Sequence, residues 1–281
     1  MRMRVWAALA LAGVIGFGVA QAQRRPDAGS DAEVVAASLL VGKGLFLRGF
    51  YLNNDLTYDG AGRVQGSPKV GDWTVAAVNV LKAERRADDE IELDGVRAAI
   101  RYNPDTHEFQ QHALNDEKMR LVVKGAGDAK QLEEAFAAMF SVGIDPALQR
   151  SMPDYWRHYF DPALPWPEDG LHGQTIYPLF GAADQAKDVV APVVGHRVDA
   201  KYGDFAVRDK VQGVIQLRLV VDSTGGPVRI AILKPLGYGL DAAAVEAMRK
   251  WRFSPGTRGG EPVATGVAVE QEFKVMSAPQ R

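Results

Sequence analysis

The feature that most constrains this chain is a change in the spacing of its apolar residues between positions 211 and 275. Apolar and polar side chains alternate over 211–222, as in a strand with one buried face. Turn residues over 222–226 lead into a second alternating run that begins at Val228. A helical pattern follows, and the alternation returns over 263–275. This order predicts a small antiparallel sheet that packs with one helix.

The predicted helix begins near Asp241, whose carboxylate is placed to accept the unpaired amide protons of the first turn. Basic residues at its end suit the helix dipole, and Ser254-Pro255-Gly256 stops it. The residues on its apolar face are Leu240, Ala244, Val245, Met248 and Trp251. We therefore expect this face to lie on the sheet.

The stretch from Pro235 to Pro255 reads PLGYGLDAAAVEAMRKWRFSP. Together with the flanking strand patterns, it resembles the C-terminal domain of the TonB family of periplasmic energy transducers. The resemblance covers residues 189–275 and includes Gly213-Val-Ile-Gln-Leu217 and Lys250-Trp-Arg-Phe-x-Pro255. One departure is Tyr202-Gly203, where the family usually has Tyr-Pro. The resemblance implies a protein-binding module with no catalytic chemistry of its own.

The whole chain is predicted to be an α+β protein with two domains. Short strand patterns over 45–125 and a helical pattern over 128–141 indicate an antiparallel β-rich N-terminal domain, 45–150, whose function the sequence does not identify. We expect this domain to be a meander, either a sandwich or a small barrel. A connector rich in aromatic residues and Pro, 151–187, leads to the TonB-like domain, 188–276.

Residues 1–22 have the pattern of a cleaved signal peptide. A basic start precedes an apolar run over 5–19, and Ala20-Gln21-Ala22 supplies the small residues of a cleavage site. A polar leader, 23–44, follows. The apolar run is shorter than the ~20 residues of a spanning helix, so we expect release into the periplasm. If the signal is not cleaved, the chain stays anchored in the membrane.

The resemblance also implies a Ser and a His in a membrane-spanning N-terminal helix. Neither residue occurs over 5–22, which argues against coupling to the proton-motive force. The formal net charge is −2, and loss of Arg2 and Arg4 with the signal would leave −4, so we expect no nucleic-acid binding. The chain has no cysteine, and its 47% hydrophobic content over 281 residues is enough for two cores.

No pattern predicts a catalytic residue, a metal site or a cofactor. His107 and His112 are not at the i, i+4 spacing of a zinc helix, and Asn103-Pro104-Asp105 indicates a loop there. His158 is close to Asp161 in sequence, but no Gly-x-Ser-x-Gly elbow and no cysteine supplies a nucleophile. We therefore expect a protein that is not an enzyme.

The last strand supplies the predicted binding site, at the small or polar positions Ala264, Gly266, Ala268 and Glu270. An edge strand offers unpaired amides and carbonyls, and small side chains let another strand approach. The resemblance implies pairing with a short N-terminal box of an outer-membrane transporter. We expect such a transporter, or another envelope protein, to bind by strand addition. Two alternatives stay open: charged residues protect this edge, or it is paired within a homodimer.

A second hypothesis places the function in the N-terminal domain, as a binder of a glycan, a lipid or a peptidoglycan fragment. Tyr155, Trp156 and Trp166 are its candidate ligand-binding residues, because clustered aromatic rings can stack on a sugar or hold a partner. The alternative interpretation is that these rings fix the connector against both domains.

Overall fold

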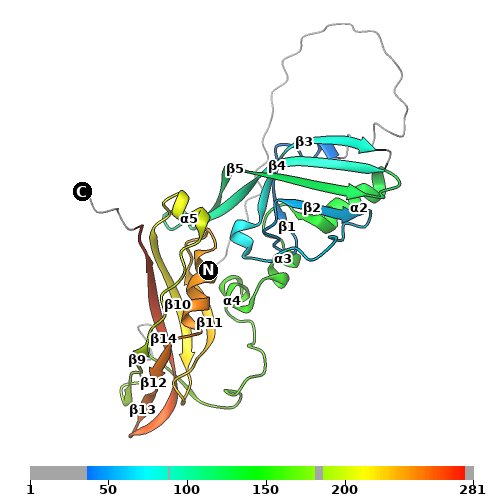
Figure 1. The fold of residues 1–281 in the computed structure, drawn as a ribbon. Coiled ribbons are helices and arrows are strands. Elements are labelled where there is room, and N and C mark those ends of the chain that lie inside the picture. The colour runs from blue at the N-terminus through cyan, green and yellow to red at the C-terminus, as the bar shows by residue number, and fades with distance from the viewer. Residues whose placement is uncertain (1–36, 88, 181–185, 276–281) are drawn as a thin grey trace, which may run out of the picture.

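The computed structural model describes residues 37–87, 89–180 and 186–275. The fold is α+β, as predicted, with one sheet in the N-terminal half and another in the C-terminal part (Figure 1). The predicted signal peptide lies outside the described residues. No helix within the described ranges is long and apolar enough to cross a membrane.

The N-terminal sheet has six strands in the order β2-β5-β4-β3-β1-β6. They are β1 (Gly44–Leu47), β2 (Asp55–Asp59), β3 (Ala77–Ala87), β4 (Glu90–Asn103), β5 (Glu108–Lys124) and β6 (Phe140–Ser141). All neighbouring pairs are antiparallel except β2 and β5, which are parallel. Helix α2 (Ala129–Met139) packs its buried side chains against this sheet, and Asp128 caps it by accepting the amide of Gln131 at 2.8 Å.

This open sheet replaces the sandwich or barrel that we expected from the sequence. Asp94-Gly95 reads as a turn, yet it lies inside β4, where Gly95 lets β3 approach closely. A Cβ at Gly95 would meet the carbonyl oxygen of Asn79 at 2.5 Å. Most side chains over 108–118 are exposed and polar, so the first part of β5 shows no alternation in the sequence. The sequence therefore predicts several short strands where the structure has the two long strands β4 and β5.

The C-terminal sheet has the strand order β11-β10-β14-β13-β8, with β7 beside β14. The strands are β7 (Ile176–Pro178), β8 (Val189–Val190), β10 (Gly213–Val221), β11 (Pro227–Lys234), β13 (Gly256–Arg258) and β14 (Glu261–Phe273). Two helices belong to the same part of the chain, α5 (Asp204–Arg208) and α6 (Leu240–Met248). A separate pair consists of β9 (Val193–His196) and β12 (Arg252–Ser254). Strands β10, β11 and β14 and helix α6 lie where the apolar spacing predicts them.

Asp241 does not cap α6 in the predicted way. Gly239, with a φ of 74°, is the N-cap residue, and Asp241 lies fully buried in the first turn. Its carboxylate accepts the amides of Leu236 and Gly237 at 2.9 and 2.7 Å. The carboxylate therefore fixes the loop before the helix instead of satisfying the amides of the helix itself.

The two parts of the protein share one apolar core. It includes Trp73 of the short 3-10 helix η1 (Trp73–Val75) and Ile100 of β4, together with Leu236 and Tyr238 from the loop before α6. The amide of Tyr238 donates to the carbonyl of Ile100 at 2.9 Å. Helices α3 (Pro146–Ser151) and α4 (Asp154–Phe160) lead from one sheet to the other (Figure 1).

Candidate partner-binding edge

Strand β14 has different neighbours on its two sides. On one side β10 pairs with it antiparallel from Thr265 to Phe273. Strand β13 pairs with it over 261–263, and β7 pairs over 264–266 with the side that faces away from β10. Within the described part of the chain, no strand pairs with this second side beyond Gly266. Residues 267–273 are called the free edge below.

One hydrogen bond shows which backbone groups face the free edge. The carbonyl of Gly266 accepts the amide of Leu179 at 2.8 Å, so the backbone of Gly266 faces away from β10. Backbone groups of alternate residues in a strand face the same side. The amides and carbonyls of Ala268, Glu270 and Glu272 therefore face the free edge, whereas the amide of Val269 faces β10.

The side chains of the free edge leave room for an approaching strand. Ala268, Glu270 and Glu272 are exposed, whereas Val267 and Val269 pack against the shared core from the other face. The Glu270 carboxylate accepts the side-chain amide of Gln216 on β10 at 2.8 Å. This hydrogen bond directs the Glu270 carboxylate along the sheet toward β10, away from the approach of a new strand.

Two of the four predicted binding residues are already paired inside the chain. Ala264 is 2% exposed and lies opposite Ile176, and Gly266 lies opposite Pro178. A Cβ at Gly266 would meet the ring of Phe180 at 3.1 Å, so the glycine allows this approach. A three-residue strand that includes a proline carries no readable alternation, and sequence reasoning therefore missed β7.

The predicted ligand aromatics do not line an open groove. Trp156 is 0% exposed, and its Nε1 donates to Asp72 at 2.8 Å. Tyr155 is also buried, and burial raises the pKa of its hydroxyl. Trp166 is half-buried and stacks on His158 with the ring centres 3.5 Å apart. This packing corrects the expectation of a groove at Tyr155 and Trp156, because both rings are used inside the core.

Two buried carboxyl groups lie where the two parts meet. Asp72 accepts the amide of Thr74 at 2.9 Å, and the Thr74 hydroxyl accepts the amide of Gly239 at 2.8 Å. Burial raises the pKa of Asp72 and raises that of Asp241 to about 8, with the charge of Asp72 as the second cause for Asp241. Because both groups are buried, this polar network holds the two parts together.

The histidines of the described ranges lie apart from any cluster that could hold a metal ion. Within the described ranges, no group of three or more His, Asp and Glu residues is placed to hold a metal ion. The Nδ1 atom of His107 lies 3.0 Å from the Tyr102 hydroxyl. His158 is 1% exposed, burial lowers its pKa, and neither ring nitrogen has a hydrogen-bond partner among the described residues. Its ring therefore makes no hydrogen bond to Asp161.

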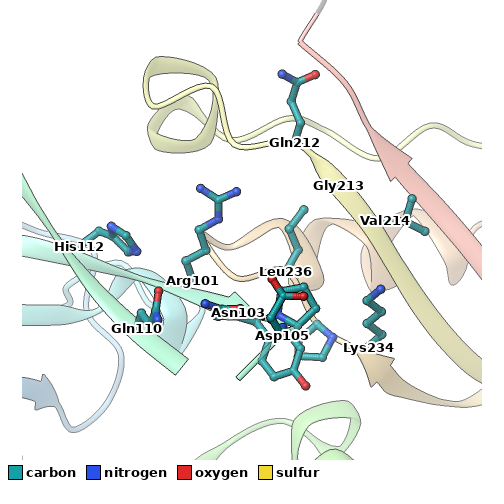
Figure 2. Close-up of a pocket in the computed structure, with 13 residues that line it drawn as sticks. Arg101, Asn103, Asp105, Gln110, His112, Gln212, Gly213, Val214, Lys234 and Leu236 are labelled. Atoms are coloured by element: carbon teal, nitrogen blue, oxygen red, sulfur yellow. Dashed lines mark hydrogen bonds between the residues drawn. The ribbon is translucent and has the colours of Figure 1, made fainter. Parts of the chain in front are cut away.

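A pocket of about 440 Å³ lies between the two parts of the protein (Figure 2). Arg101 and Lys234 line it, and among the described residues neither side chain makes an ion pair. His112 also lines it, and its Nε2 atom is buried without a hydrogen-bond partner in the described structure. Gly213, the pairing partner of Phe273, borders the same pocket, so the pocket lies near one end of the free edge.

Known proteins resemble the C-terminal part of this chain. The sequence model of the family described as Gram-negative bacterial TonB protein C-terminal matches residues 199–275. Protein TonB of Vibrio cholerae is 29% identical over 84 residues, which are 30% of this chain and 34% of that protein. Protein tonB2 of Pseudomonas aeruginosa is 35% identical over 81 residues, which are 28% of this chain and 30% of that protein. The chain thus spans about a third of the length of the curated relatives it matches.

Among solved structures, the solution NMR structure of Pseudomonas aeruginosa TonB CTD is similar to part of this chain. The likeness covers 33% of this chain and 91% of that chain, with 23% sequence identity and a TM-score of 0.27.

Proposed function

We propose that residues 199–275, which match the TonB C-terminal family model, bind an extended segment of an outer-membrane or periplasmic protein as an added strand on β14. The observation that carries the proposal is the pairing of β7 with β14. This side of β14 accepts an added strand, and beyond Gly266 no described strand follows. In this role the protein acts in the periplasm, takes part in TonB-type transport and is not an enzyme.

The backbone of the free edge supplies most of the expected affinity. Residues 267–273 span roughly 23 Å, which is the length of a short extended peptide. Ala268, Glu270 and Glu272 each direct one amide and one carbonyl outward, and a net gain of about 1 kcal/mol for each hydrogen bond gives roughly 6 kcal/mol. The conformational entropy that the peptide loses on binding offsets part of this free energy. We therefore expect a weak, reversible complex.

A proline at position 268 tests the proposal. The Ala268 amide faces the free edge, so Ala268→Pro removes one donor and places a ring in the path of the partner, without removing an amide that pairs with β10. We expect binding to weaken by at least about 10-fold, from the lost hydrogen bond and the obstruction together. The probes are synthetic peptides of the N-terminal, periplasm-facing segments of outer-membrane transporters from the same cells, measured by fluorescence anisotropy.

Two further variants control this experiment. Ala268→Ser keeps both the amide and the small side chain, so its binding should equal that of the unaltered chain. Val269→Pro removes an amide that faces β10 and should lower the free energy of unfolding by about 1–3 kcal/mol. Full binding by a folded Ala268→Pro variant would refute strand addition at the free edge. A concentration-dependent dimer that Ala268→Pro abolishes would assign the edge to a second copy of the chain.

The pocket of Figure 2 favours a second candidate function, the binding of a carboxylate-bearing peptidoglycan fragment. Arg101 and Lys234 bring two positive side chains to the cavity, and Asp105 brings one negative side chain. The two cations suit a carboxylate ligand. Isothermal titration with muramyl dipeptide should show binding that Arg101→Ala weakens. If the unaltered chain shows no binding, this function is excluded for that ligand.

A further inference from the structure

Strand β7 occupies β14 in the way that an added partner strand would. Residues 176–178 run parallel to 264–266, and the Leu179 amide continues the ladder to the carbonyl of Gly266 at 2.8 Å. This carbonyl belongs to the same alternating set as those of Ala268 and Glu270 on the free edge. The edge proposed for the partner is therefore continuous with the edge that the connector already uses.

The backbone ladder that holds β7 is short. The strand has three residues, and alternation from Leu179, which donates to Gly266, puts Tyr177 and Leu179 toward β14 and Pro178 away from it. One side-chain hydrogen bond adds to this ladder, from the Arg258 guanidinium to the Tyr177 hydroxyl at 2.9 Å. Its apolar support is a small cluster in which Ile176 packs beside Leu171, Val220 and Ala264. Phe180, which follows β7, remains 37% exposed. A parallel strand of three residues is weaker than the long antiparallel ladder between β14 and β10.

Ion pairs fix the connector on both sides of β7. Before it, the Arg229 guanidinium contacts both carboxylate oxygens of Asp169, with both distances 2.7 Å. After it, Arg258 pairs with Asp188 at 2.6 Å. A displaced β7 therefore stays close to β14, at an effective concentration on the order of millimolar. A tethered competitor of this kind lowers the apparent affinity of any strand that needs the same positions.

From this geometry we infer that β7 is a built-in competitor for the partner-binding edge, and that a partner segment displaces it to pair with β14 over 264–273. The inference rests on the proposed function and adds regulation to the same edge. Before displacement, a partner meets only the free edge, 267–273. After displacement, the buried small residues Ala264 and Gly266 also become available for pairing.

A disulfide lock tests the inference. The chain has no cysteine, so Ile176→Cys with Ala264→Cys introduces the only thiols. These two positions are register partners and belong to the same apolar cluster, and paired neighbours in a sheet lie within the Cα separation that a disulfide spans. The oxidised protein holds β7 on β14, and reduction with dithiothreitol frees it. The single variant Ile176→Cys controls for the substitution itself.

A second variant releases β7. Ile176→Asp with Leu179→Pro removes the apolar contact and the amide donor to Gly266, and Ile176→Val with Leu179→Ala is the matched control that keeps both. The probe for all proteins is a free peptide with the sequence of residues 174–180, whose pairing with β14 is known from the fold. Full-length mature chains are titrated with the labelled peptide by fluorescence anisotropy.

We expect the peptide to bind the released variant about 10-fold more tightly than the unaltered chain, as for a competitor at millimolar effective concentration and a peptide dissociation constant near 100 μM. The oxidised lock should not bind it, and reduction should restore binding. Equal binding to the locked, unaltered and released chains would overturn the inference, as would no binding to the released chain. Neither result depends on the Ala268→Pro test with transporter peptides, so the two proposals can fail separately.

Discussion

Trp156 provides a quantitative test of how the connector joins the two parts of the protein. Its ring is 0% exposed and meets the Trp73 ring edge-on, with centres 5.1 Å apart. Truncation of a large buried side chain to alanine costs about 3–5 kcal/mol. The lost hydrogen bond from Nε1 to the buried Asp72 adds about 1–3 kcal/mol, because a buried polar group loses one of its partners. We therefore expect Trp156→Ala to lower the free energy of unfolding by at least about 4 kcal/mol.

Urea unfolding of a chain that lacks residues 1–22, followed by circular dichroism, measures this change. Trp156→Phe is the matched control, since it keeps an aromatic ring in the core and loses the donor, and we expect it to cost about 1–3 kcal/mol. The difference between the two variants isolates the packing contribution. A loss of less than about 1 kcal/mol for Trp156→Ala would refute the shared core. Muramyl dipeptide or glycan binding that disappears in Trp156→Phe without loss of stability would restore a ligand role for this ring.

Two further predictions concern the contact between the two parts. Because burial raises the pKa of Asp241 to about 8 from its ordinary 3.8, the folded chain binds this proton more tightly than the unfolded chain does. The resulting stability is complete below about pH 4 and is lost as the pH rises toward about 8, by up to about 1.4 kcal/mol per pH unit, and Asp241→Asn should flatten this dependence in urea titrations. Gly237 has a φ of 92°, and a Cβ there would overlap the carbonyl oxygen of Ile100, so Gly237→Ala should cost more than about 2 kcal/mol. The matched control Gly66→Ala, with a φ of 77° and no atom within 4 Å of the added Cβ, should cost about 1 kcal/mol in the same thermal or urea assay.

The C-terminal fold could be predicted from the sequence because the spacing of its apolar residues agrees with its tertiary contacts. Val267 and Val269 alternate with exposed residues and do pack on one face, and the apolar face of α6 is buried as its spacing predicts. The strand lengths and strand order of the N-terminal sheet were harder to predict. Gly95 is of a residue type typical of turns, but in the structure it allows β3 and β4 to pack closely. No local sequence pattern predicts the parallel pairing of β2 with β5.

The candidate site was predictable only in part, for a related reason. Outward small or polar residues on the last strand can be recognised from alternation alone, and this pattern indicates Ala268 and Glu270. Whether a strand side is free depends on segments distant in sequence, and β7 reaches β14 from the connector. Likewise, the sequence shows that Trp156 is aromatic but not that Asp72, far away in the chain, accepts its Nε1 proton.

The contact with the N-terminal part and the partner edge use different regions of the C-terminal domain. The N-terminal part contacts the loop before α6, through Ile100 and Tyr238, and no strand of the N-terminal sheet pairs with β14 in the described structure. The connector reaches both regions, with Trp156 in the core and β7 on the edge. The Asp169–Arg229 pair fixes the chain between them. Displacement of β7 can therefore proceed without opening the shared core. We expect a partner to bind at β14 while the connector still holds the N-terminal and C-terminal parts together through Trp156.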